Sequence, residues 1–160
     1  MRKQPLYSAI ISSPLGKIGL LLTHGKVSEV SFLPESAAEM IPDDNNVKLV
    51  TAQLAKYFAN PRYQFSLALD ACGSVFQRRV WQALCEVPSG ETWTYGQLAK
   101  KLQTSPRAVG QACRSNPLPI IVPCHRIVAA HDLGGYAGKT DGKLMDVKKW
   151  LLRHEGAIKG

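Results

Sequence analysis

TYGQLAKKLQTSPRAVGQACRSNP, residues 94–117, contains two helix starts in close succession and is the most informative segment about the fold. Thr94 with Gln97 three residues later matches a capping box, in which each side chain satisfies a backbone group at the helix start. Ser105-Pro106 is a second start, an N-cap followed by a proline at the first helical position. Asn116-Pro117 ends the second helix. The stretch predicts two short helices joined by a tight turn.

This helix pair has helix-turn-helix spacing, and its second helix carries two arginines on one face. Arg107 and Arg114 are seven residues apart, which is two helical turns. Such a face is suited to meet DNA. Paired short helices also occur in many helical domains, so the pattern alone leaves a purely structural role open.

The pair leads into NPLPIIVPCHR, residues 116–126, where three prolines stiffen the chain ahead of a cysteine and a histidine. Each proline fixes φ and lacks a backbone donor, so neither an ordinary helix nor a central strand is expected. Cys124 is a potential thiolate nucleophile and His125 a potential base. Because the two are adjacent, proton transfer between them needs a turn or an intervening water. A cysteine that is only a small buried hydrophobe is the alternative.

Positive charge is concentrated in the second half of the chain. Residues 1–74 hold seven Lys and Arg against six Asp and Glu, whereas residues 75–160 hold thirteen against six, which divides the net charge of +8 into +1 and +7. The second half is therefore the part expected to face a polyanion. A basic surface that only aids solubility gives the same charge.

Composition places the chain among soluble globular proteins of the cytoplasm. Its 160 residues are 45% hydrophobic and 20% charged, and no apolar stretch approaches the roughly 20 residues of a membrane span or resembles a signal peptide. The four cysteines form no Cys-x-x-Cys pair and no zinc-module spacing, so free thiols, no metal site and no cofactor are expected.

Outside the central stretch, the pattern changes near residue 70, and we place a domain boundary there, between residues 1–70 and 71–160. The first part predicts an antiparallel meander of three strands, then a helix ending at Asn60-Pro61, then a further strand. These predicted strands cover residues 6–12, 18–23, 27–33 and 64–69. The second part predicts helices beginning near Phe76 and, at the end, over residues 141–155.

Four ordered blocks together resemble a known family: RAVG at 107–110, RSNP at 114–117, IVPCHR at 121–126 and LLRHEG at 151–156. They are similar to the O6-alkylguanine-DNA alkyltransferases, also called methylated-DNA–protein-cysteine methyltransferases. The detailed similarity covers about residues 76–156, and residues 1–70 match only in coarse pattern. The resemblance implies an α+β protein with a small ribonuclease-H-like N-terminal scaffold followed by a helical, winged-helix DNA-binding domain.

The family resemblance also implies the reaction. Cys124 would attack the alkyl carbon on guanine O6, displace the guanine and keep the alkyl group as a thioether, so each molecule would act once. His125 would serve as the base through a water, and Glu155 would orient the imidazole. Asn116 would tie the second helix to the loop of the cysteine. A satisfied polar His125 and a solvated Glu155 are the structural alternatives.

On the DNA side, the resemblance implies that Arg107 enters the base stack as an arginine finger and that Tyr95 presses on the phosphate of the flipped nucleotide. The loop Gly134–Gly138 would form a wall of the guanine pocket. The expected DNA-binding and substrate-binding residues are Tyr95, Arg107, Ala108, Arg114, Ser115, Val122, Tyr136, Ala137 and Gly138.

The implied partner is double-stranded DNA containing O6-alkylguanine, with no membrane contact, no obligate protein partner and a monomer in the free state. Three other functions fit part of the pattern. A silent sensor of alkylated DNA would not need Cys124, a thiol hydrolase would have no use for Arg107, and a transcription factor would not need the reactive segment.

Overall fold

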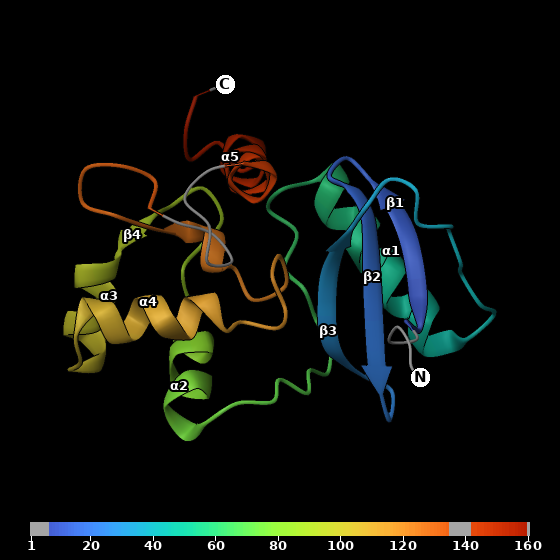
Figure 1. The fold of residues 1–160 in the computed structure, drawn as a ribbon, viewed down its shortest axis with the longest axis horizontal. Helices are drawn as coiled ribbons and strands as arrows, with labels where there is room; N and C mark the ends of the chain where they lie inside the picture. Colours follow the sequence, from blue (N-terminus) through green and yellow to red (C-terminus); the bar gives the residue numbers. More distant parts are fainter. Residues whose placement is uncertain (1–6, 135–141, 160) are drawn as a thin grey trace. The chain divides into compact units, whose positions relative to one another are not determined.

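The computed structural model describes residues 7–134 and 142–159 of an α+β chain, drawn in Figure 1. The chain divides into two compact units between Cys72 and Gly73, and the boundary expected from the sequence follows residue 70. Over the described ranges, no helix combines the length and the apolar composition needed to cross a membrane.

The first unit is an antiparallel sheet in the order β1-β2-β3 with one helix on its face (Figure 1). The strands are β1 (Ala9–Ser13), β2 (Gly16–Thr23) and β3 (Lys26–Leu33), and α1 covers Asn45–Ala59. Inward side chains of the sheet and of α1 form the core, including Ile18, Leu20, Leu54 and Tyr57. The meander and the helix are therefore confirmed, with strand bounds shifted by at most three residues; residue 6 of the first predicted strand lies outside the described residues.

The strand predicted over residues 64–69 is wrong. Only one isolated bridge joins this segment to the sheet, between Val27 and Leu69. The reason is that the Gln53 side chain forms hydrogen bonds with the backbone of Ser66. The Ser66 N–H donates to Oε1 of Gln53 at 2.8 Å, and Nε2 of Gln53 donates to the Ser66 carbonyl at 3.1 Å. A side chain thus satisfies groups that a strand ladder would otherwise use.

The second unit contains four α-helices, a short η1 helix and one two-residue strand pair in its described part. These are α2 (Val75–Leu84), β4 (Trp93–Thr94), α3 (Tyr95–Leu102), α4 (Pro106–Arg114), η1 (Cys124–Arg126), β5 (Ile127–Val128) and α5 (Lys143–His154). The expected helices are present, and residue 141 of the last one lies outside the described residues. The parallel pairing of β4 with β5 was not predicted.

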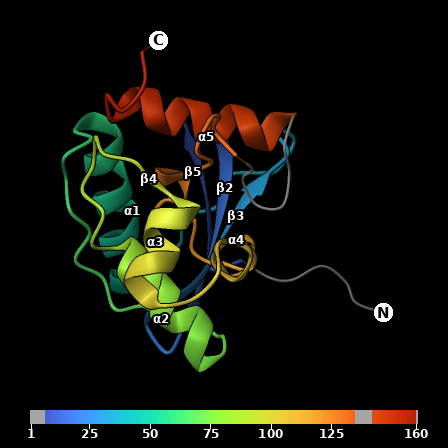
Figure 2. The same ribbon diagram turned by 90° about the vertical axis from the view of Figure 1, so that its left-hand side faces the viewer.

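The two short helices α3 and α4 lie side by side, as Figure 2 also shows. Both predicted caps are confirmed: the Thr94 hydroxyl accepts from the Gln97 N–H, and the Ser105 hydroxyl accepts from the Ala108 N–H. Helix α3 ends at Leu102, and its C-cap Gln103, with φ of +58°, turns the chain toward α4. The indole N–H of Trp81 on α2 donates to the Ala112 carbonyl at 2.8 Å, which fixes α4 against α2.

Candidate active site and nucleic-acid interface

The side chain of Asn116 shapes the loop that leads to Cys124. Its Oδ1 accepts a hydrogen bond from the Leu118 N–H at 2.9 Å, and its Nδ2 donates to the Val122 carbonyl at 2.9 Å. The Val122 N–H in turn donates to the Leu118 carbonyl at 2.8 Å. Asn116 thus supplies partners that the backbone of a proline-rich loop cannot supply for itself.

Two unusual backbone conformations precede the thiol. Ile120 has φ of +76°, which is rare for a β-branched residue, and it is held there by complete burial. At Pro123, φ of −80° and ψ of 66° form an inverse γ-turn, closed by a 2.8 Å hydrogen bond from the Cys124 N–H to the Val122 carbonyl. The chain around Cys124 is therefore bent away from helix and strand, as the prolines predict.

Cys124 is buried, with 7% of its surface exposed. Burial raises the pKa of its thiol, because the thiolate loses water, while the hydrogen bond of the Asn116 side chain and the positive charge of Lys148 act in the opposite direction. The thiol is thus neutral at rest, and its ionisation requires a group that accepts the proton.

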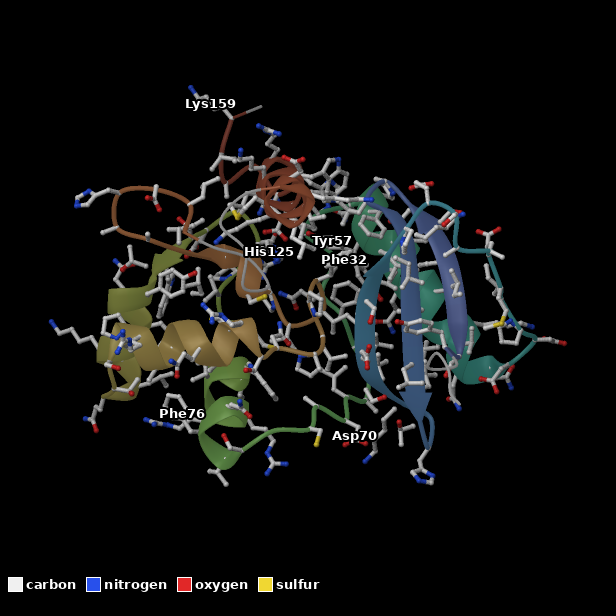
Figure 3. The ribbon with its side chains drawn as sticks, viewed as in Figure 1. Phe32, Tyr57, Asp70, Phe76, His125 and Lys159 are labelled. Carbon is white, nitrogen blue, oxygen red and sulfur yellow. The ribbon has the colours of Figure 1, made fainter. Side chains whose placement is uncertain are left out.

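His125, which is labelled in Figure 3, is fully buried. Its Nε2 lies 2.9 Å from Oε2 of Glu155. Its other ring nitrogen, Nδ1, is buried and has no hydrogen-bond partner among the described residues. Burial lowers the pKa of His125, and the hydrogen bond and charge of Glu155 only partly offset this effect. A neutral imidazole hydrogen-bonded to a carboxylate is the state in which histidine acts as a base.

Glu155 is the C-cap of α5, and its carboxylate is also held by Arg126. The guanidinium donates from Nε to Oε1 at 2.9 Å and from Nη2 to Oε2 at 2.8 Å. Burial would raise the pKa of Glu155, but the hydrogen bonds from His125 and Arg126 outweigh it and hold the pKa below its usual value. No role for Arg126 was predicted from the sequence.

Lys148 is a second residue of the site that was not predicted from the sequence. Its Nζ donates to the carbonyls of Ile127 and Leu133 inside the unit, and burial lowers its pKa to about 8, opposed by Cys124, Cys113 and Asp132. A signal was present in the sequence: Lys148 follows Leu144 by four residues and precedes Leu151 by three, which places a charge on the apolar face of the last helix. Among described residues, no cluster of three or more His, Cys, Asp or Glu side chains is placed to hold a metal ion.

The predicted DNA-side residues that the structure describes lie on α3, on or just after α4, and in the loop before Cys124. Arg107, Arg114 and Ser115 are exposed on or just after α4, and Ala108 is half-buried on its first turn. Val122 is buried in the loop before Cys124. Tyr136, Ala137 and Gly138 lie outside the described residues.

Tyr95, the first residue of α3, is framed by two glycines. A Cβ on Gly134 would lie 3.0 Å from Cε2 and 3.2 Å from the hydroxyl oxygen of Tyr95, and one on Gly110 of α4 would lie 3.9 Å from the ring. Gly134 has φ of +70°, a conformation that favours glycine. These close approaches fix the tyrosine ring between α4 and the loop that follows β5.

The fold and the site together define a class: α+β proteins in which a cysteine followed by a buried histidine–glutamate pair stands beside a capped helix pair. The family described as "6-O-methylguanine DNA methyltransferase, DNA binding domain" matches residues 75–157. The methylated-DNA–protein-cysteine methyltransferase of Methanosarcina mazei is 39% identical, over 94% of this chain and 97% of that protein. The Mycobacterium leprae protein of the same name is 39% identical over 84% of this chain and 86% of its own.

Solved structures of proteins with this activity are also similar to the chain. The Mycobacterium tuberculosis O6-methylguanine methyltransferase has a TM-score of 0.77 at 34% identity, covering 95% of this chain and 94% of that one. A structure of the M. tuberculosis protein in complex with DNA has a TM-score of 0.76 at 34% identity, covering 91% and 90%. The chain belongs to the methylated-DNA–protein-cysteine methyltransferase family.

Proposed function

We propose that this protein repairs O6-alkylguanine in double-stranded DNA by transferring the alkyl group irreversibly to Cys124, once per molecule. The Sγ atom forms a bond to the alkyl carbon while the bond from that carbon to guanine O6 breaks. The electron pair of the broken bond stays with the guanine, which gains a proton. The observation that supports this most strongly is the buried His125–Glu155 pair directly after the cysteine, in a chain of this family.

The proposed relay runs from Cys124 through a water to His125. Nδ1 is the ring nitrogen without a hydrogen-bond partner among the described residues, and Nε2 is already occupied by Glu155. A water between Sγ and Nδ1 would carry the thiol proton to the imidazole, and the Glu155 carboxylate would stabilise the imidazolium that forms. Lys148 adds a positive charge whose field favours the thiolate.

On the DNA side, we propose that α4 enters the minor groove and that the damaged nucleotide leaves the stack, since a buried thiol cannot reach O6 within a duplex. Arg107, exposed at the start of α4, would fill the space left in the stack. The phenol of Tyr95 would face the phosphate of the flipped nucleotide, with Gly110 and Gly134 restricting the ring.

Mass spectrometry of the protein mixed with excess duplex containing O6-methylguanine tests this function. We expect one methyl group on Cys124, saturating at one per molecule, with guanine restored. Cys124→Ser should abolish uptake and retain DNA binding, whereas Cys72→Ser, at an exposed cysteine, is the matched control. Binding of the lesion by unmodified protein would favour a sensor, multiple turnover a hydrolase, and indifference to the lesion a regulator.

A further inference from the structure

The Glu155 carboxylate has a second partner, Arg126, that takes no part in the relay proposed above. Its guanidinium binds both carboxylate oxygens, and Oε2 is shared between Nη2 of Arg126 and Nε2 of His125, at 2.8 and 2.9 Å. The carboxylate is fully buried, and only 11% of the Arg126 side chain is exposed. The pair is therefore shielded from solvent, where a charge-assisted bidentate contact is strong.

Arg126 also connects this carboxylate to a distant part of the unit. Its Nη1 donates to the carbonyl of Val87, just beyond α2, at 2.6 Å. Because η1, the end of α5 and the chain after α2 all meet at one planar guanidinium, the position of Glu155 is set by a rigid fork rather than by the C-terminus of α5 alone.

The charged groups that act on His125 come from two elements, α5 and η1. Helix α5 supplies Glu155 and Lys148, and η1 supplies Arg126 together with the titratable thiol of Cys124. On α2, which also packs against η1, the charged side chains Arg78 and Arg79 are exposed. A buried carboxylate in direct contact with a histidine favours the imidazolium, whereas a cation on the same carboxylate opposes it.

We propose that Arg126 is a positioning residue for the relay: it fixes Glu155 against Nε2 of His125 and neutralises part of its charge, so that His125 stays neutral and able to accept a proton. This inference rests on the proposed function, since it assigns a role to Arg126 within the same site. An unshared carboxylate would hold His125 as an imidazolium, and an imidazolium cannot accept the proton of Cys124.

The test uses alkylation of Cys124 by iodoacetamide, followed by peptide mass spectrometry between about pH 6 and pH 8 in the intact protein without DNA. We expect the alkylation rate of Arg126→Met to fall more steeply toward acid than that of the wild type. The ratio of the rate at about pH 8 to the rate at about pH 6 should be about tenfold larger in Arg126→Met than in the wild type. Arg126→Lys, which keeps the charge but not the fork, should restore the pH profile at a lower rate. The matched control is Arg79→Met, because Arg79 likewise donates to a backbone carbonyl, that of Leu102, but does not touch Glu155.

A second readout does not depend on the variants folding. Ring ¹⁵N shifts of His125 in the wild-type protein should report a neutral imidazole with hydrogen on Nε2 at about pH 6, and an imidazolium there would overturn the proposal. A pH profile of Arg126→Met that is unshifted, or shifted toward acid, would also overturn it. Failure of the wild type to take methyl from DNA would refute the proposed function instead, because neither of these readouts uses DNA.

Discussion

His125 and Glu155 are 30 residues apart in the sequence, yet their side chains form a fully buried contact. An isolated buried carboxylate would take up a proton, because burial penalises its charge. Here two donors compensate it, the imidazole and the Arg126 guanidinium. Glu155 therefore remains ionised inside the protein because the fold brings these two donors to its carboxylate.

The first prediction concerns the acid stability of this anion. Since the pKa of folded Glu155 lies below its unfolded value, its ionisation contributes stability that is present above that unfolded value and is lost as pH falls. The unfolding free energy of the wild type should therefore drop relative to Glu155→Gln below about pH 5. Urea denaturation at stepped pH measures this difference, with Glu91→Gln as the exposed control; parallel curves for wild type and Glu155→Gln would contradict it.

The second prediction compares alanine substitutions at two glycines with positive φ, Gly134 and Gly156. Only at Gly134 would the added Cβ also crowd neighbouring atoms. Gly134→Ala should slow alkyl transfer at least tenfold, because its Cβ would meet the Tyr95 ring and the Ala129 N–H at 3.0 to 3.2 Å, while φ is +70°. Gly156→Ala is matched, since Gly156 has φ of +77° and nothing lies within 4 Å of its added Cβ. It should cost about 1 kcal/mol of stability with transfer retained. Equal transfer rates in the two variants would argue that the close approach of Gly134 to the Tyr95 ring has no role in transfer.

At the scale of elements, the helices of the second unit are defined by local hydrogen bonds at their starts. Ser74 and Thr94 each form a complete capping box, and Ser105 caps α4 ahead of Pro106. The helices have eight to ten residues over α2, α3 and α4, so each is too short to be stable in isolation. Caps and packing must both contribute.

Ser105→Ala should therefore destabilise the protein by about 1 kcal/mol, because the Ala108 N–H loses its acceptor. Thermal unfolding followed by circular dichroism measures the loss. Ser115→Ala is the control at the other end of α4, where the hydroxyl only donates to the Gln111 carbonyl, and it should stay within about 0.5 kcal/mol of the wild type. Equal effects of the two substitutions would mean that the cap does not stabilise α4.

At the scale of the whole molecule, charge is separated along the chain, with +7 of the total +8 after residue 74. The logarithm of the association constant for duplex DNA should fall linearly with the logarithm of the salt concentration. The association constant should depend little on the DNA sequence. Arg114→Gln, at an exposed position on α4, should reduce the slope by about one. Fluorescence anisotropy across salt concentrations checks both; a slope unchanged by Arg114→Gln would place this face away from the phosphates.

Features that depend on neighbours along the chain could be predicted from the sequence. Caps, turns and apolar periodicity act within a few residues, so the strands of the meander, the helix pair and the non-regular backbone before Cys124 were all predictable. The ordered blocks from Arg107 to Gly156 were sufficient to indicate the family, which the comparisons then showed.

Contacts between residues that are distant in the sequence could not be predicted and are seen only in the folded protein. Arg126 and Lys148 lie in the site, and β4 pairs with β5. The backbone of Ser66 forms hydrogen bonds with the Gln53 side chain and not with a neighbouring strand. The physical reason is that a buried polar group must find a partner wherever the fold brings one within reach, and the sequence spacing between partners does not restrict that choice.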